Sequence, residues 1–287
     1  MDKRSSKIIG IDVGGTKILL QTFDEKLNLT GEIKAWTETK KGATGFMDQL
    51  CHLIDRVFHK GIKGIGVALP GIVNIHNGTL AKAPHLPTPA NFPIKSLLEK
   101  KYKTRIAVDN DINAFLIAEK ETPRLKKYDN LIAIMVGTGL GSAIIADGKM
   151  VYGKNGYAGE AGHIVINSGG QLKTLEQNTS GSFVPKIAKQ LGIKKKIEAK
   201  DLEKKIPETE RIKDHMLKSL GIGLANLNLI FNPEVFILGG SIYRLFLSDK
   251  KKELMKMIAD ISLDGASPLI MDADESISPA KGMVLHF

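Results

Sequence analysis

Two glycine-rich turns, one in each half of the chain, have the composition of phosphate-binding loops. Gly14-Gly15-Thr16-Lys17 follows the apolar segment Ile8–Val13, and Gly137-Thr138-Gly139 follows Leu131–Val136. Neither turn is a P-loop, and an apolar, β-branched segment rather than a helix follows each, so both are expected to be β-hairpins. Glycine lets backbone N–H groups approach phosphate oxygens closely. The matched pair therefore favours phosphate binding over two plain hairpins.

Side chains that could hold a polar ligand occur at two places. Asp111 stands at the start of the predicted helix 112–120, where the helix dipole favours an ionised carboxylate. Aspartate is also a preferred helix N-cap, so both a chemical role and a capping role are open. Glu160 and His163 lie three residues apart beside two glycines, a spacing that lets both side chains reach one ligand.

The elements that must position these residues alternate between strand-like and helix-like segments, which is typical of α/β architecture. The Pro-rich stretch 70–93 is expected to be irregular. The second half repeats the pattern of the first, with a buried strand, a Gly/Thr turn and a second apolar strand. We therefore expect an internal duplication that gives two similar lobes, each offering a hairpin to a shared cleft. The predicted strands are 8–13, 18–23, 31–36, 62–69, 105–108, 131–136, 143–145 and 234–238, and the predicted helices are 46–57, 112–120 and 212–231.

The composition is that of a globular protein, with 43% hydrophobic and 25% charged residues among 287. The apolar runs are too short to span a bilayer, and residues 1–6 lead directly into a strand, which leaves no room for a signal peptide. The single cysteine, Cys51, allows no intrachain disulfide, so the cytoplasm is the expected location. The net charge of +10 is interpreted as a lysine-rich surface. Its densest segment, 194–205, is expected to be a solvated helical face because it contains acidic residues and no aromatic residue.

Four motifs stand out along the chain: Ile11-Asp12-Val13-Gly14-Gly15-Thr16-Lys17, Asn110-Asp111-Ile112-Asn113-Ala114, Ala158-Gly159-Glu160-Ala161-Gly162-His163 and Gly239-Gly240. They occur in the order found in ROK-family sugar kinases, and the chain resembles that family from about residue 8 to its end. The resemblance implies an actin-like ATPase fold, in which two ribonuclease-H-like lobes surround a cleft that holds ATP, Mg²⁺ and a sugar. It also implies that the C-terminal helix packs back on the first lobe. We expect a small lobe of residues 1–121 together with 272–287, and a large lobe of 122–271.

The resemblance implies a role for each motif. Asp111 would be the catalytic base that accepts the proton of the sugar hydroxyl, since phosphoryl transfer depends mainly on positioning and charge neutralisation. Asp12 would orient Mg²⁺, which prefers oxygen ligands. The sugar would contact Asn110, Asp111, Glu160, His163 and Glu176. ATP would contact Asp12, Gly14, Gly15, Thr16, Lys17, Gly137, Thr138, Gly139, Gly239 and Gly240.

Three departures from the family pattern affect the expected site. Many members hold zinc with the histidine of a Gly-His pair and three nearby cysteines, but residues 168–176 contain no cysteine, so no zinc site is predicted. His85 stands where the family often places a sugar-contacting asparagine, and it is therefore included among the substrate residues. Ser278-Pro279-Ala280 lacks the small-residue helix start that is usual near the end.

The sequence therefore predicts transfer of the γ-phosphate of ATP to a hydroxyl of a hexose, with glucose as the first candidate. A kinase for another hexose or an N-acetylhexosamine, and a catalytically silent sugar sensor of the same fold, remain alternatives. Family repressors carry a helix-turn-helix ahead of the first motif, which begins here at Ile8, so a nucleic acid is not an expected partner. The short apolar runs likewise predict no membrane partner. An actin-like filament former or chaperone is disfavoured, because it would have no sugar for Glu160 and His163. The sugar hydroxyl, a donor other than ATP and the oligomeric state stay open, a homodimer included.

Overall fold

Residues 6–83, 85–168 and 170–287 are described by a computed structural model, in which the chain divides into two units. Unit 1 contains the described residues up to Lys126, the segment Tyr152–Ala158 and the segment Asp274–Phe287. Unit 2 contains Lys127–Val151 and Gly159–Ala273. These divisions lie a few residues from the boundaries expected at 121/122 and 271/272. The segment Tyr152–Ala158 is a further part of unit 1 that the sequence did not indicate.

The sheet of unit 1 has the strand order β3-β2-β1-β4-β7. Strand β1 pairs in antiparallel fashion with β2 and in parallel with β4, and β4 is parallel to β7. Strands β1 and β4 are apolar along almost their whole length because both faces of the sheet are covered. The carboxyl ends of β1, β4 and β7 therefore meet at one edge. The strands are β1 (Ile8–Val13), β2 (Lys17–Phe23), β3 (Leu29–Trp36), β4 (Gly64–Leu69) and β7 (Arg105–Asn110).

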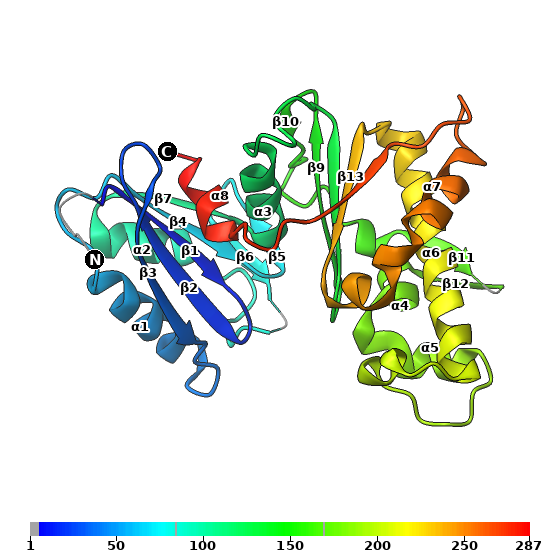
Figure 1. Cartoon of the computed structure of the whole chain (residues 1–287). Helices are drawn as coiled ribbons and strands as arrows, with labels where there is room; N and C mark the ends of the chain where they lie inside the picture. Colours follow the sequence, from blue (N-terminus) through cyan, green and yellow to red (C-terminus); the bar gives the residue numbers. More distant parts are fainter. Residues whose placement is uncertain (1–5, 84, 169) are drawn as a thin grey trace. The chain divides into compact units, whose positions relative to one another are not determined.

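Helices α1 (Gly42–Asp55) and α2 (Ile94–Tyr102) cover one face of this sheet, where they share a core with Ile9, Ile11 and Val13. Helices α3 (Asp111–Lys120) and α8 (Pro279–Val284) lie on the other face, and Figure 1 shows α8 beside α3. Helix α8 begins at Pro279, and the Ser278 hydroxyl caps it by accepting a hydrogen bond from the backbone N–H of Ala280.

The face covered by α8 is packed backbone against backbone. A Cβ atom added at Gly66 of β4 would lie 2.7 Å from the carbonyl oxygen of Met283. A Cβ at Gly10 would overlap the carbonyl group of Ala280, and one at Gly282 would overlap the carbonyl group of Ala114 in α3. Only glycine allows so close an approach, so these positions fix α8 against both the sheet and α3.

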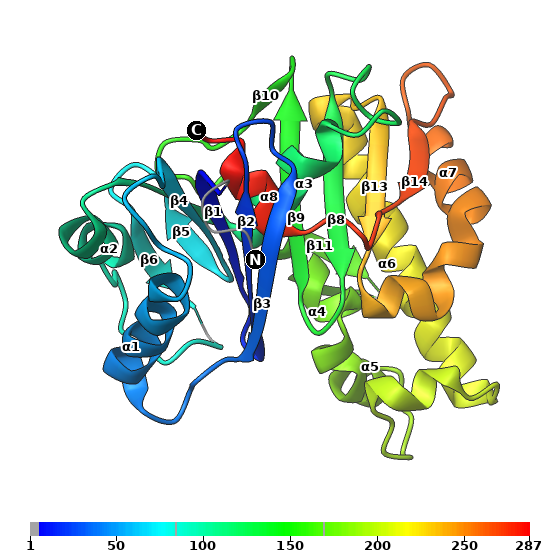
Figure 2. The same ribbon diagram turned by 60° about the vertical axis from the view of Figure 1, so that its left-hand side comes forward.

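The sheet of unit 2 has the order β10-β9-β8-β13-β14, which repeats the order of the first sheet, as the expected duplication requires (Figure 2). Its core is formed with the long helix α6 (Pro207–Phe231) and with α7 (Lys251–Ala259). The short helices α4 (Leu175–Thr179) and α5 (Val184–Gln190) follow a two-stranded ribbon of β11 (Val165–Ser168) and β12 (Gln171–Thr174). The strands of the sheet are β8 (Leu131–Val136), β9 (Leu140–Ala146), β10 (Lys149–Met150), β13 (Val235–Gly239) and β14 (Leu269–Asp272).

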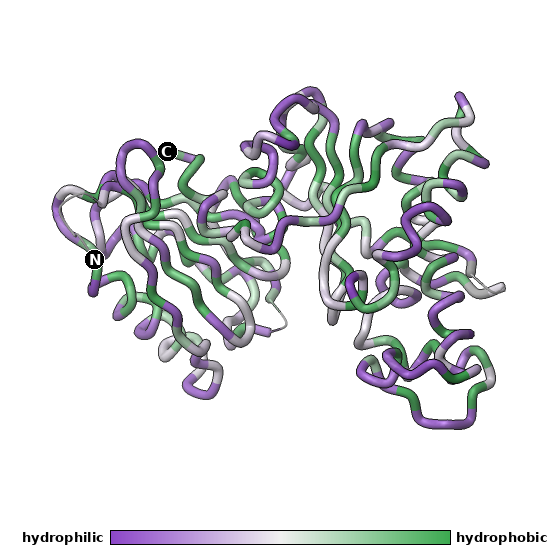
Figure 3. Tube along the Cα trace, in the orientation of Figure 1, coloured by the Kyte–Doolittle hydropathy of each residue, from purple (hydrophilic) through white to green (hydrophobic). Residues whose placement is uncertain are grey.

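Two expectations about local structure were wrong. The Pro-rich stretch 70–93 contains a small antiparallel pair of β5 (Ile72–Asn74) and β6 (Thr79–Lys82), because Gly78 and the Asn residues around it form a tight turn. The lysine-rich segment forms loops and the short 3₁₀-helix Ala199–Glu203 rather than a helical face, since Lys196 and Lys200 pair with Glu198 in the turn. Figure 3 shows the apolar residues concentrated on the strands of both sheets.

Within the described ranges, no helix combines the length and the apolar character that crossing a membrane would require.

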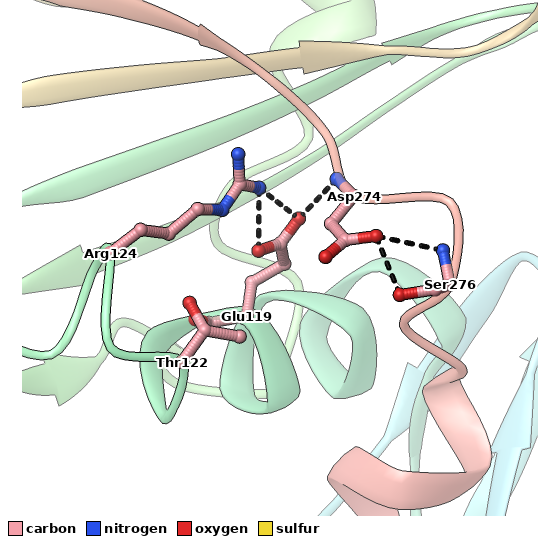
Figure 4. A network of polar contacts seen from close by, with 5 residues as sticks. All are labelled: Glu119, Thr122, Arg124, Asp274 and Ser276. Carbon is pink, nitrogen blue, oxygen red and sulfur yellow. Dashed lines mark hydrogen bonds and ion pairs between the residues drawn. The ribbon is translucent and has the colours of Figure 1, made fainter.

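The far end of α3 is held by a buried carboxylate. Glu119 is fully buried, and Nη2 of Arg124 donates to both of its carboxylate oxygens, at 2.7 and 2.8 Å. The backbone N–H of Asp274 donates to the same carboxylate at 2.6 Å, as Figure 4 shows. The network therefore ties α3 to the segment that leads into α8.

We expect Arg124→Ala to lower the free energy of unfolding by about 3 kcal/mol, because it leaves a buried carboxylate without its cation. Lys126→Ala is the matched control, since Lys126 lies 3.7 Å from the exposed Glu121 and such pairs contribute less than about 1 kcal/mol. Denaturant unfolding of both variants checks the difference. Equal losses of unfolding free energy in the two variants would show that the ion pair of Arg124 with the buried Glu119 stabilises the fold no more than an exposed pair does.

Candidate functional site

The turn of the β1–β2 hairpin in unit 1 contains backbone N–H groups that a ligand could use. Gly14 N donates to the carbonyl oxygen of Lys17 at 2.8 Å. Thr37, the residue after β3, donates from its N–H to the carbonyl oxygen of Thr16 and from its hydroxyl to that of Gly14. Within the described part of the chain, the N–H groups of Gly15 and Thr16 donate no hydrogen bond. These two donors therefore remain available to a ligand with phosphate oxygens.

His85 lies against this hairpin. A Cβ atom at Gly15 would be 2.7 Å from the Cβ of His85, so the hairpin depends on glycine here and the imidazole stands beside the predicted phosphate site. The neighbouring Pro84 lies outside the described residues.

Asp12 lies near the end of β1, on the sheet face shared with α3 and α8. Asp12 and Gly10 are two residues apart in β1, so both residues face the same side of the sheet. Asp12 is also paired with Ala68 of β4, which packs against Ala114 and Met283. Its side chain is mostly buried, and this burial raises the pKa of the carboxyl to about 6. Within the described residues the carboxylate accepts no hydrogen bond that would offset this effect.

A desolvated carboxylate with no donors around it is suited to a cation. Among the described residues no cluster of three or more His, Cys, Asp or Glu residues could hold a metal ion by itself. Mg²⁺ often binds proteins through one carboxylate and completes its coordination with water and substrate phosphates. Asp12, next to the N–H groups of the hairpin, fits that mode of binding.

The junction between β7 and α3 places Asn110 and Asp111 at the same edge. The N-cap of α3 is Asn110, whose side-chain oxygen accepts from Ile112 N and Asn113 N, while its amide donates to the carbonyl oxygen of Gly71 at 2.7 Å. Asp111 is the first residue of the helix, so the capping role considered for Asp111 belongs to Asn110. Both residues are strong caps, and only the backbone conformation decides between them.

The spacing of the strands suits a phosphate and its acceptor. Asp12 is paired with Ala68, and Ala68 with Asp109, the residue before Asn110. Two steps of about 4.8 Å between neighbouring strands separate Asp12 from the β7–α3 junction by about 10 Å. A metal-bound phosphate group and a hydroxyl can lie side by side across that distance.

Unit 2 brings together the other predicted sugar residues. Nδ1 of His163 lies 3.4 Å from Oε2 of Glu160. Burial raises the pKa of Glu160, the charge of Glu176 raises it further, and His163 opposes both effects. Glu160, His163 and Glu176 thus form one polar cluster.

Glu176 also supports the β8–β9 hairpin. Its Oε2 accepts a hydrogen bond from Leu140 N at 2.9 Å, and a Cβ at Gly139 would be 2.9 Å from the same oxygen. The hairpin closes on itself through Gly137 N and the carbonyl oxygen of Gly139. The sequence assigned Glu176 to the sugar alone, and nothing in the motif spacing indicated this second contact.

The Gly239-Gly240 turn lies beside the same hairpin. Gly240 has a φ of +92°, and a Cβ there would lie 2.7 Å from the carbonyl carbon of Val136. A Cβ at Gly137 would be 3.5 Å from the hydroxyl oxygen of Ser241. Ser182 N also donates to the carbonyl oxygen of Thr138 at 3.1 Å. The sequence analysis did not single out Ser182 or Ser241 as site residues, because both lie far from residues 137–139 in the sequence.

Residues 8–260 match the model of the ROK family. The chain belongs to this family. It is 34% identical over 289 residues to a xylose repressor of Caldicellulosiruptor bescii, covering 89% of this chain and 71% of the relative. It is 26% identical to a glucokinase of Thermotoga maritima, with 83% of both chains covered. The crystal structure of a ROK family glucokinase from Streptomyces griseus in complex with glucose and AMPPNP is similar, with a TM-score of 0.70, 26% identity and 96% of both chains covered.

Membership of the ROK family and the structural similarity confirm the predicted actin-like ATPase fold. Each unit has the five-stranded order of a ribonuclease-H-like domain. The predicted absence of zinc stays a prediction: the stretch 168–176 has no cysteine, and Gly169 within it lies outside the described residues, as do residues 1–5.

The raised pKa of Asp12 predicts a pH-dependent effect of Asp12→Asn on stability. Since the pKa of about 6 in the folded state exceeds that of the unfolded chain, wild-type stability from this group falls as the pH rises from about 4 to 6. The asparagine variant lacks this loss. In EDTA, its stability relative to wild type should therefore be greater at pH 8 than at pH 5 by about 1 kcal/mol.

Denaturant unfolding at the two pH values measures this difference. Asp48→Asn, at an exposed aspartate of α1, is the control and should behave alike at both. If the stability difference between Asp12→Asn and wild type were as independent of pH as that of the control, the assignment of Asp12 as a desolvated carboxylate would be wrong.

Proposed function

We propose that this ROK protein transfers the γ-phosphate of ATP to a hydroxyl of a hexose, with glucose as the first candidate and Asp111 as the catalytic base. The observation that carries the proposal is the arrangement at one sheet edge of unit 1. There, Asp12 and the donors of the β1–β2 hairpin lie at the same edge as Asp111, and Asn110 rather than Asp111 is the N-cap of α3.

The described residues support a simple division of tasks. Mg²⁺, held by Asp12, would neutralise the charge of the phosphates. The N–H groups of Gly15 and Thr16, with Lys17, would hold the transferred phosphate, and the Gly-rich turns of unit 2 would take the remainder of the nucleotide. Asp111 at a helix N-terminus would stay ionised and accept the proton of the attacking hydroxyl.

Glu160, His163 and Glu176, together with Asn110 and His85, are proposed to hold the sugar. The exposed pair of Glu160 and His163 offers one acceptor and one donor, the combination that a sugar hydroxyl needs. An N-acetylhexosamine remains an alternative substrate. We also propose a cytoplasmic location, because ATP as the phosphate donor is available there.

A second candidate function is sugar sensing without catalysis. The observation that favours it is the 34% identity to a xylose repressor. The retention of Asp12, Asp111 and a cradle of N–H donors favours the kinase, because a sensor needs the sugar contacts alone.

We expect release of ADP that depends on both sugar and Mg²⁺ when the purified protein is offered glucose, mannose, fructose, N-acetylglucosamine and xylose with ATP. A coupled assay for ADP measures it, and sugar-free ATP hydrolysis is the control. Sugar binding by calorimetry without any ADP release would favour the sensor.

Asp111→Asn should lower kcat by about 10²- to 10⁴-fold, because the amide cannot accept a proton. Since Asn110 is the cap and an asparagine at position 111 can still accept from Ile112 N, Asp111→Asn should keep nearly wild-type thermal stability, whereas Asp111→Ala also loses the contact with Ile112 N. Asn110→Ala is the matched control and should lose about 1 kcal/mol of stability.

Steady-state kinetics and thermal unfolding of the three variants separate the roles. If Asp111→Asn retains more than about a tenth of wild-type kcat, Asp111 is not the base.

A further inference from the structure

A third carboxylate, Asp109, lies two residues before the proposed base, in strand β7, and has no part in the chemistry described above. Asp109 is fully buried at the end of β7. A charge in such a place needs hydrogen-bond donors, and Asp109 has three. Its Oδ1 accepts from Asn110 N at 2.7 Å and from Nδ2 of Asn113 at 2.9 Å, and its Oδ2 accepts from the Tyr152 hydroxyl at 2.7 Å.

Two of these contacts hold the first turn of α3. Asn113 is itself buried in that turn, so its bond to Asp109 ties the helix to the preceding strand. Asn110, whose N–H contacts the same carboxylate, caps the helix from the other side. Asp111 lies between these two residues, and its backbone position is therefore set by the Asp109 carboxylate.

The third contact comes from a distant part of the chain. Tyr152 is the first residue of Tyr152–Ala158, the segment of unit 1 that follows strand β10 and leads into the Glu160–His163 motif. Burial and the charge of Asp109 raise the pKa of Tyr152, so its hydroxyl stays protonated and donates. Gly156 of the same segment lies against β5, where a Cβ would be 2.9 Å from the carbonyl oxygen of Val73.

We infer that Asp109 and Tyr152 are positioning residues that hold Asp111 in the orientation needed for proton transfer. The Tyr152 hydroxyl anchors the segment before the sugar motif to the carboxylate that orders the first turn of α3. This inference rests on the proposed kinase function for its kinetic consequence, but the ordering of α3 can be measured without it.

Tyr152→Phe removes the hydroxyl and keeps the ring. We expect kcat to fall about tenfold, because a small misplacement of a catalytic group is costly, while the KM values for sugar and ATP change less than about threefold. His286 is the nearest replacement donor, with Nε2 3.6 Å from Oδ2 of Asp109. The double variant Tyr152→Phe/His286→Ala removes that replacement and should lose at least as much kcat.

Tyr102→Phe is the matched control. The Tyr102 hydroxyl also donates to a carboxylate, that of Asp55, at 2.8 Å, and also lies in unit 1. Tyr102 ends α2 just before the start of β7, whereas Asp109 lies at the other end of that strand. This variant should lower the melting temperature to a similar extent and leave kcat within about twofold of wild type, since distant sites act independently.

Hydrogen exchange of peptides covering residues 109–116 provides the second readout. We expect faster exchange of the first turn of α3 in Tyr152→Phe than in Tyr102→Phe. The inference is overturned if Tyr152→Phe and the double variant keep kcat within about twofold of wild type, or if exchange in α3 does not differ from the control. A wild-type protein inactive on every sugar would contradict the proposed kinase function alone, and the exchange experiment would still decide whether Tyr152 orders the helix.

Discussion

The close backbone packing of α8 against α3 and the sheet of unit 1 is the constraint on which the candidate site depends. Gly10, Gly66 and Gly282 bring three elements so near to one another that no side chain fits between them. Protein interiors are close-packed and transmit displacement rather than absorb it. The axis of α3 is thereby fixed relative to β1, and with it the relation of Asp111, at the first turn of the helix, to Asp12, near the end of the strand.

Three aspartates at this edge have different surroundings, and the surroundings explain the different tasks proposed for them. Asp109 is buried and accepts three hydrogen bonds, which compensate the loss of hydration of its carboxylate. Its proposed task is therefore structural. Asp12 is desolvated without such donors, which makes an added cation favourable. Asp111 begins a helix whose cap is Asn110, and its carboxylate accepts a hydrogen bond from the backbone N–H of Ile112 at 2.9 Å. Residue type alone could not have sorted these roles, because all three are aspartate.

Much of the fold could be predicted because it depends on local patterns. Both Gly-rich turns are hairpins between apolar strands, and the strand-helix alternation of each half is found in the two matching sheets. The positioning contacts could not be predicted, since they join residues far apart in the chain. Tyr152 lies 43 residues from Asp109, and Gly282 resembles a helix breaker until its contact with Ala114 is known. The cap of α3 was ambiguous for another reason: Asn110 and Asp111 are adjacent and equally suited to it.

The proposed sugar loop of unit 2, residues 160–176, contains no cysteine, and other contacts hold its polar cluster in place. Helix α4, which carries Glu176, begins with a capping box in which Thr174 and Gln177 bind each other's backbone N–H groups. Asn178, one turn along, bonds the buried His215 of α6 at 3.0 Å. These contacts fix Glu176, and Glu176 in turn holds the β8–β9 hairpin through Leu140 N. Because the Glu176 carboxylate contacts the hairpin and also lies near Glu160, a displacement of the proposed sugar loop would also displace the proposed nucleotide turn.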